Sequence, residues 1–160
     1  MISTERLDLL PLRVEHAAEM AEVLADPALH TFIGGAPLPP EALLARYERL
    51  VAGSPDPAER WLNWVISLRA EGRLVGTVQA TVAGQTAEIA WVVGAPWQGR
   101  GIAREAARGL VDWLTIQQVD TVVAHVHPDH HASAAVATSA GLSPTGIRHD
   151  GEVRWQRPLQ

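Results

Sequence analysis

Hydrophobic and polar residues alternate strictly in the middle of the chain. The alternation runs through residues 62–69, 74–82 and 87–93, and it has the two-residue period of a β-strand. The turn sequence "AEGR" separates the first two segments, and Gly84 lies between the second and the third. Because connections this short join neighbouring antiparallel strands, the pattern predicts a three-stranded meander.

Helical periodicity dominates on both sides of this meander. Helices are predicted by apolar residues at helical spacing in residues 14–24, 41–51, 99–116 and 132–140. Further short strands are predicted at residues 7–12, 121–127, 146–148 and 152–159. No repeat or linker interrupts this order, so we expect a single α/β domain with a mixed sheet over residues 1–160.

Composition narrows the possible chemistry. The chain contains neither cysteine nor lysine, which excludes thiolate nucleophiles, disulfides, lysine Schiff bases and lysine-dependent phosphate loops. The formal net charge of −5 argues against nucleic-acid binding and favours a cationic partner such as an amine. The missing cysteines predict a cytoplasmic protein. The lack of signal-peptide features and of a long apolar run argues against membrane insertion.

Two glycines, Gly99 and Gly101, lie where the meander passes into a predicted helix. The first turn of a helix has unpaired backbone N–H groups and a partial positive charge, and together these form an anion site. Glycine at this place lets a ligand approach the backbone closely. The stretch therefore indicates a phosphate-binding loop, with Arg100 and Arg104 adding charge at its rim.

Three kinds of phosphate loop can be compared with this stretch. A Walker loop needs a lysine, which the chain lacks. A G-x-G-x-x-G dinucleotide loop would need a third glycine at Arg104, although Asp120 lies about the right distance beyond it. The pattern Q-x-x-G-x-G/A is filled at every fixed position by "QGRGIA", residues 98–103. An ordinary strand–helix turn eased by glycines is the structural alternative.

This hexapeptide resembles the pyrophosphate-binding motif of the GNAT superfamily of acetyl-CoA-dependent N-acetyltransferases, and the resemblance extends over nearly the whole chain. "TERLDLLPL" is similar to the first strand of the RimJ/RimL-like branch, and "RLVGTVQATV" to its third. "AEIAWVVGAPWQGRGIAREAARGLVDWL" resembles its fourth strand and acetyl-CoA helix, and "VHPDHHASAAVATSAGLSPTG" the stretch around its last long helix.

The resemblance implies a GNAT fold and a cofactor site. It implies about seven strands and about four helices, with a V-shaped splay between the fourth and fifth strands. Acetyl-CoA would bind there as cosubstrate. The resemblance assigns its pantetheine to the backbone of Val92 and Val93 and its pyrophosphate to the following residues: Gln98, Gly99, Arg100, Gly101, Ile102 and Ala103.

Two side chains are candidates for the chemistry of acetyl transfer. Glu88 lies on the same strand face as Ala90 and Val92 and can accept the proton of an amine, directly or through water. An ion pair on the sheet is the alternative. Ser133 matches the family serine at the start of the last helix and would donate to the sulfur of CoA, unless it caps that helix.

Two departures from the family pattern concern the last helix. The tyrosine that many members carry there is replaced by Ala137, and the chain's one tyrosine is Tyr47. The family asparagine before the helix corresponds to His130, which can also donate and accept hydrogen bonds and is a weaker candidate for CoA contact.

"HVHPDHH" forms a histidine-rich segment around His125 and His127, which share a strand face. A metal site is one interpretation, and a pH-sensitive pocket wall or a plain polar loop is another. We expect no metal, because adjacent histidines rarely ligate the same ion.

The sequence thus predicts an enzyme that transfers an acetyl group from acetyl-CoA to a primary amine by direct attack in a ternary complex. The acceptor is a protein or peptide N-terminus or a small amine. "HTFIGG", residues 30–35, is a candidate for the acceptor side. A non-catalytic acyl-CoA-binding regulatory module and a nicotinamide-dinucleotide enzyme are the alternatives. The family resemblance implies a possible homodimer, without nucleic-acid or membrane partners.

Overall fold

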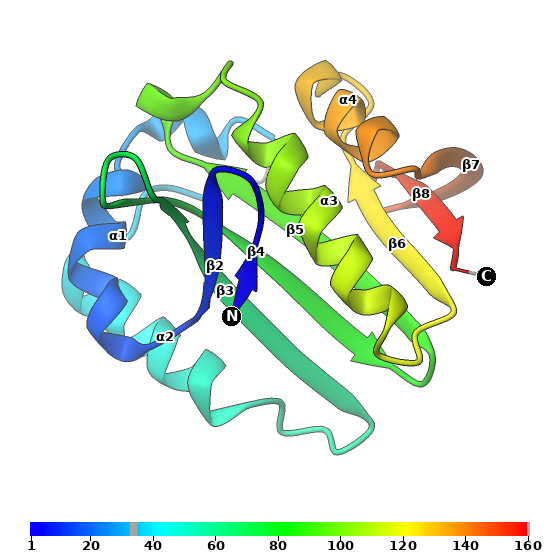
Figure 1. Cartoon of the computed structure of the whole chain (residues 1–160), viewed down its shortest axis with the longest axis horizontal. Helices are drawn as coiled ribbons and strands as arrows, with labels where there is room; N and C mark the ends of the chain where they lie inside the picture. Colours follow the sequence, from blue (N-terminus) through cyan, green and yellow to red (C-terminus); the bar gives the residue numbers. More distant parts are fainter. Residues whose placement is uncertain (33–34, 160) are drawn as a thin grey trace.

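Eight strands form one continuous sheet in the computed structural model, which describes residues 1–32 and 35–159. The strands are β1 (Ile2–Ser3), β2 (Leu7–Pro11), β3 (Glu59–Leu68), β4 (Arg73–Ala83), β5 (Thr86–Val93), β6 (Thr121–Val126), β7 (Ser143–His149) and β8 (Glu152–Pro158). Their order across the sheet is β1-β2-β3-β4-β5-β6-β8-β7, and only β5 and β6 pair in parallel. The predicted mixed α/β sheet, with its three-stranded meander β3-β4-β5, is confirmed (Figure 1).

Four α-helices cover the two faces of this sheet. They are α1 (Ala17–Val23), α2 (Pro40–Ala52), α3 (Ile102–Thr115) and α4 (His131–Ser139). On one face, Trp64 of β3 meets Trp113 of α3 edge to face, with ring centroids 5.3 Å apart. The neighbouring residue Asn63 points to the opposite face, where α1 and α2 lie. In Figure 1, α3 crosses the sheet beside β5, and α4 lies over β6.

The helix α3 begins later than its apolar pattern predicts. Periodicity alone places its start near Gly99, but Gly99 and Gly101 both have positive φ, 79° and 77°. A right-handed helix cannot pass through such residues, so α3 begins at Ile102. The first predicted helix, residues 14–24, divides into a 3₁₀ turn, Val14–His16, and α1.

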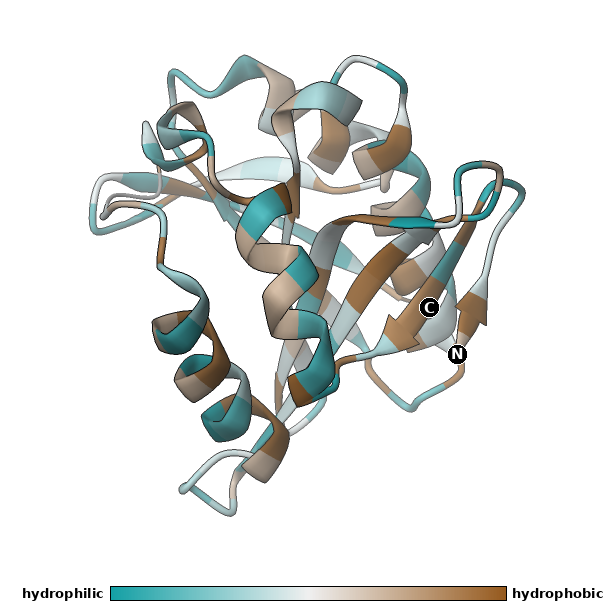
Figure 2. Cartoon of the chain, turned by 90° about the vertical axis from the view of Figure 1, so that its left-hand side faces the viewer, coloured by the Kyte–Doolittle hydropathy of each residue, from teal (hydrophilic) through white to brown (hydrophobic). Residues whose placement is uncertain are grey.

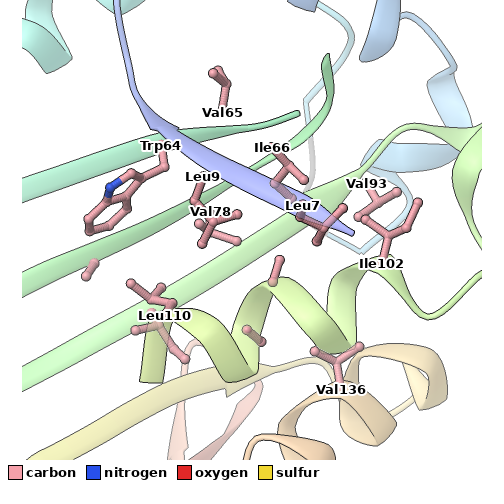
Figure 3. Packing of buried hydrophobic residues seen from close by; sticks show 14 of the residues in the cluster. Leu7, Leu9, Trp64, Val65, Ile66, Val78, Val93, Ile102, Leu110 and Val136 are labelled. Carbon is pink, nitrogen blue, oxygen red and sulfur yellow. The ribbon is translucent and has the colours of Figure 1, made fainter. Parts of the chain in front are cut away.

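The core lies mainly between α3 and the sheet. Ile102, Leu110 and Leu114 recur at four- and eight-residue spacing and are at most 1% exposed. They pack in one cluster with Leu7 and Leu9 of β2 (Figure 3). Figure 2 shows apolar residues along the central strands and both kinds of residue around the helices, as expected when one side of each helix is buried.

The parallel pair β5–β6 is short, and this creates the site. It holds only where residues 86–88 face residues 121–123. Beyond Glu88, β5 continues to Val93 paired with β4 alone, so its other edge opens away from β6. The predicted splay between the fourth and fifth strands of the family pattern is therefore present as the gap between β5 and β6. Of the helices in residues 1–32 and 35–159, none combines the length and apolar character that crossing a membrane would require.

Candidate functional site

A cavity of about 1120 Å³ extends from the splay to the side covered by α1 and α2. Its floor is formed by β3, β4 and β5, and one end is closed by the loop that precedes α3. The side chains or backbone of several predicted site residues line it: Val92, Val93, Gln98, Gly99, Gly101, Ile102, Ala103, Arg104, His130 and Ser133. His30, Phe32 and Gly35 of the predicted acceptor segment also line it, whereas Ile33 and Gly34 lie outside the described residues.

Alternate residues of β5 present their backbone groups to the opening. Antiparallel ladders alternate between residues that bond to the partner strand and residues that bond away from it. Gly94 donates its N–H to Val75 on the β4 side, while the carbonyl of Gln85 accepts from Asp120 at the start of β6. The same alternation turns Trp91 and Val93 toward the splay. It turns Val92 toward β4, so Trp91 takes the place that the sequence prediction gave to the backbone of Val92.

The loop from Gly99 to the first turn of α3 is a row of free backbone donors. Within the described part of the chain, no backbone N–H from Gly99 to Arg104 has a hydrogen-bond acceptor. No side chain caps α3, and a Cβ at Gly99 would meet nothing within 4 Å. Unpaired amides at a helix N-terminus attract anions. This loop therefore has the chemistry of a pyrophosphate site, one residue further along than the predicted start at Gln98.

Gln98 itself ties the loop to the sheet. Its backbone N–H bonds to Ala95, and its side-chain Nε2 donates to the carbonyl of Val93 at 3.0 Å. Fixing the last residue of β5 to the loop sets the angle at which the chain turns into α3. The fixed glutamine of the motif is thus accounted for by loop geometry in this structure.

The first strand braces the same loop from outside. Arg6 donates to the carbonyl of Arg100 at 2.9 Å and bonds to the carboxylate of Glu105 at 2.7 Å. The backbone N–H of Arg6 and the hydroxyl of Thr4 donate to the same carboxylate. Burial alone would raise the pKa of Glu105, but these hydrogen bonds outweigh it and lower the pKa.

The two predicted rim arginines have different surroundings. Arg100 pairs with Glu71 at 3.0 Å, and Trp97 donates its indole N–H to the same carboxylate. These two hydrogen bonds, the one from Trp97 first, lower the pKa of Glu71. Arg104 is exposed and lines the cavity, and it forms no hydrogen bond or ion pair with any residue that the structure describes. Arg104 is therefore the cation available to a bound phosphate.

Ser133 lies in the first turn of α4, and its hydroxyl is hydrogen-bonded to a side chain of the sheet. The indole Nε1 of Trp91 donates to Ser133 Oγ at 3.0 Å. The N-cap of α4 is His130, whose Nδ1 accepts the backbone N–H of Ser133 at 3.3 Å. Capping is therefore performed by His130. Nothing else within residues 1–32 and 35–159 accepts the hydroxyl proton of Ser133, which leaves it able to donate.

His130 is arranged as a neutral hydrogen-bonding group. Burial, with further contributions from His127 and His131, lowers the pKa of His130. Because its Nδ1 accepts a hydrogen bond, the remaining proton of the neutral ring is on Nε2. Phe32 stacks on this ring with centroids 4.4 Å apart. The ring thus combines an acceptor and a donor, as the side chain of the family asparagine would.

Glu88 lies at the apex of the splay, where it is the last residue of β5 paired with β6. Its side chain is 57% exposed and lies 3.4 Å from Nδ1 of His125. It shares a sheet face with Ala90 and Val92, as the alternation predicts, but these two line the cavity and Glu88 is just beyond its boundary. Glu88 and His125 therefore form a pair at the cavity's edge.

The histidine-rich segment divides between two surroundings. His125 turns to Glu88 and to the ring of His149, 5.3 Å away. His127 accepts the backbone N–H of Asp129 and packs against Phe32. Across the part of the chain that the structure describes, no three histidine, aspartate or glutamate side chains gather as a metal ion would require.

Several functional contacts escaped the sequence reasoning. Nothing in the local sequence pattern of Trp91 indicates its bond to Ser133. Arg6 and Glu105 are 99 residues apart, so their pairing has no local signal either. On the acceptor side the cavity is lined by Tyr47, whose burial raises its pKa to about 12, and by the side chains of Asn63 and Gln79.

Comparison with known proteins connects this geometry to a family. The model of the acetyltransferase (GNAT) domain matches residues 6–143. A comparison with curated proteins gave no significant match. Among solved structures, a GNAT-family acetyltransferase from Bacillus anthracis has a TM-score of 0.83 at 20% identity, covering 99% of this chain and 98% of that one.

Two further structures of this fold are similar. Spermidine N-acetyltransferase from Vibrio cholerae, in complex with CoA and spermine, has a TM-score of 0.77 at 18% identity, covering 98% of this chain and 97% of that one. RimL, a ribosomal L7/L12 alpha-N-protein acetyltransferase in complex with CoA, has a TM-score of 0.80 at 16% identity, covering 98% and 96%.

Proposed function

Because the chain belongs to the GNAT acetyltransferase family, whose cosubstrate is acetyl-CoA, we propose that it acetylates a primary amine by direct attack in a ternary complex. The observation that carries this proposal is the row of free backbone N–H groups from Gly99 to Arg104 at the end of the splay. That row fits a pyrophosphate, and the adjoining cavity has room for both substrates. We also assign the chain to the RimJ/RimL-like branch, on its sequence resemblance. Its cytoplasmic location and homodimeric state remain predictions.

The proposed binding mode follows the edge of β5. Trp91 and Val93 would bond the amide groups of pantetheine through their backbone, as a further strand would. Gly99 to Arg104 would hold the pyrophosphate, with Arg104 at its rim. The thioester would then lie toward the apex of the splay, between Ser133 on α4 and Glu88 on β5. These two side chains come from opposite sides of the gap.

The proposed chemistry uses Glu88 and Ser133 in separate roles. The amine nitrogen bonds to the thioester carbonyl carbon, the carbon–sulfur bond breaks, and CoA leaves as the thiol. Glu88 accepts the proton that the amine must lose, directly or through water, and His125 Nδ1 lies 3.4 Å from its carboxylate. Ser133 donates its proton to the departing sulfur and regains one from water, and Glu88 releases the amine's proton to water, so both groups return to their starting states. Ser133 can donate because Trp91 occupies an acceptor position on its oxygen and leaves its hydrogen free.

The proposal is tested by measuring CoA release from acetyl-CoA over a panel of primary amines. The protein has no cysteine, so a thiol reagent reports the released CoA without protein background. We expect amine-dependent release that Ser133→Ala slows. Binding of acetyl-CoA without transfer to any amine would contradict the enzymatic proposal and favour a regulatory acyl-CoA-binding module.

A further inference from the structure

The cavity lining lacks negative charge. Among the described residues that line it, the charged side chains are Arg46 and Arg104, and there is no aspartate or glutamate. Ile33 and Gly34, which complete the neighbouring segment in the sequence, are also uncharged. The net charge of −5, which favoured a cationic partner, thus resides elsewhere. The cavity walls next to a bound acceptor therefore carry neutral and positively charged side chains.

Arg46 is the cation on the acceptor side. It lies on α2, one residue before the buried Tyr47, whereas Arg104 lies at the start of α3 beside the phosphate loop. Arg46 is exposed and has no hydrogen bond or ion pair with any residue in the described ranges. Its guanidinium therefore has its full donor capacity available for a carboxylate.

Two carboxamides lie side by side on the cavity floor. Asn63 of β3 and Gln79 of β4 are register partners, and Gln79 is in turn the partner of Ala90 on β5. Neither side-chain amide bonds to another described residue, and both line the cavity. Such groups can donate and accept without carrying charge, so they suit a peptide group or a carbonyl.

From this arrangement we propose that the acceptor is an amine that also carries a carboxylate, as in an amino acid or a short peptide. Arg46 binds the carboxylate, and Asn63 and Gln79 bind the neutral polar groups between it and the amine. This inference rests on the proposed acetyl transfer and specifies its substrate class. A polyamine does not fit, because its second and third charges would lie near arginine without a carboxylate to meet them. Glu88, the base of the proposed reaction, is outside the cavity lining and pairs with His125.

The test compares acceptors that differ in one charge. CoA release is measured with dialanine and its C-terminal amide, with tetraalanine and its amide, with free alanine, and with spermidine. We expect each carboxylate form to have a kcat/KM about tenfold above that of its amide, the size of one charge-assisted contact, and spermidine to be the poorest acceptor. The acceptor length separates the two sources, because a preference for free alanine indicates an amino acid and a preference for dialanine or tetraalanine indicates a peptide.

Variants on α2 assign the effect to one side chain. Arg46→Gln should abolish the preference for carboxylate by raising the KM of the carboxylate acceptors. Arg49→Gln, an exposed arginine on the same helix outside the lining, should keep it. Spermidine as the best acceptor would overturn the inference. So would an Arg46→Gln protein that keeps the preference, or failure to acetylate any carboxylated amine.

Calorimetric titration with acetyl-CoA separates this inference from the proposal on which it rests. If acetyl-CoA does not bind, the proposed function fails. If acetyl-CoA binds and amines are acetylated without preference for carboxylate, only the substrate class is wrong.

Discussion

Ser133 owes its orientation to an indole 42 residues away in the sequence. A serine hydroxyl rotates freely unless a neighbour fixes it, and the N–H of Trp91 fixes the oxygen from one side. At the same helix end, His130 satisfies the backbone N–H of Ser133. The three residues together hold the hydroxyl where a departing thiolate would need a proton.

Replacing Trp91 by phenylalanine should reduce kcat while leaving acetyl-CoA binding intact. The ring keeps its packing, but the donor to Ser133 is lost. One neutral hydrogen bond contributes about 1 kcal/mol, so the expected loss is about fivefold. Trp61→Phe is the matched control, because it removes an indole bond to Glu59 on β3, two strands away from β5. Steady-state kinetics that do not distinguish the two variants would refute the positioning role of Trp91.

Replacing Glu88 by glutamine should lower kcat/KM for the amine by about a hundredfold, the usual range for a lost general base. Glutamine has nearly the same shape, and this position is more than half exposed, so stability should not change. Glu48→Gln, on the exposed side of α2, serves as the control for charge alone. An unchanged kcat/KM at every pH measured would remove Glu88 from the mechanism.

His130 should make stability depend on pH. Burial lowers its pKa below the ordinary histidine value of 6.5 in the folded protein, so the unfolded chain binds the proton more readily. At pH values above 6.5 His130 therefore does not reduce the free energy of unfolding. As the pH falls from 6.5 toward the pKa of the folded state, the free energy of unfolding decreases. His130→Asn should flatten this fall more than His131→Asn, which removes only one of the smaller contributions to the lowered pKa. Chemical denaturation at a series of pH values measures the free energy of unfolding. Parallel plots of this free energy against pH for the wild type and His130→Asn would contradict this role.

At the level of elements, the phosphate loop is held between two anchors. Gln98 bonds it to the end of β5, and Arg6 bonds it to the connection before β2 through Arg100 and Glu105. The loop has no side-chain cap of its own, so its open amides depend on these neighbours. A binding site built from backbone alone is positioned by the residues that surround it.

Glu105→Ala should weaken acetyl-CoA binding and lower the melting temperature together. The substitution removes the carboxylate that accepts hydrogen bonds from the hydroxyl of Thr4 and from the backbone and side chain of Arg6. Loss of such a charged, hydrogen-bonded group should lower stability by about 1–3 kcal/mol. Asp112→Ala, an exposed acidic residue two turns along the same helix, is the control. If Glu105→Ala lowers the melting temperature but binds acetyl-CoA normally, the brace supports the fold and not the loop.

Sequence patterns predicted the elements well where the local period decides the structure. The meander is correct because alternation at positions such as Leu62 and Val78 directly encodes the sheet faces. The start of α3 was wrong by three residues, because periodicity does not report the backbone conformation of Gly99 and Gly101. The bond from Trp91 to Ser133 could not be predicted, since it depends on how β5 and α4 meet across the splay.

At the scale of the whole molecule, the short pairing of β5 with β6 decides what the fold can do. Three paired residues on each strand join the two halves of the sheet. Beyond them, the free edge of β5 leads to the cavity and to the unpaired amides before α3. The α1–α2 layer closes the acceptor side, while α3 and α4 supply the groups on the cofactor side. The proposed activity therefore depends most on the amides from Gly99 to Arg104, which would bind the pyrophosphate of acetyl-CoA.

Calorimetric titration with acetyl-CoA tests that claim most directly, using the unmodified protein, Gly101→Glu and Gly151→Glu. Both glycines have similar positive φ, 77° and 82°, so the two variants carry comparable backbone strain, but Gly151 lies in the remote β7–β8 hairpin. We expect binding to the unmodified protein and to Gly151→Glu, and its loss in Gly101→Glu, because a carboxylate there repels the phosphates. No binding to the unmodified protein, or equal binding to all three, would contradict the account.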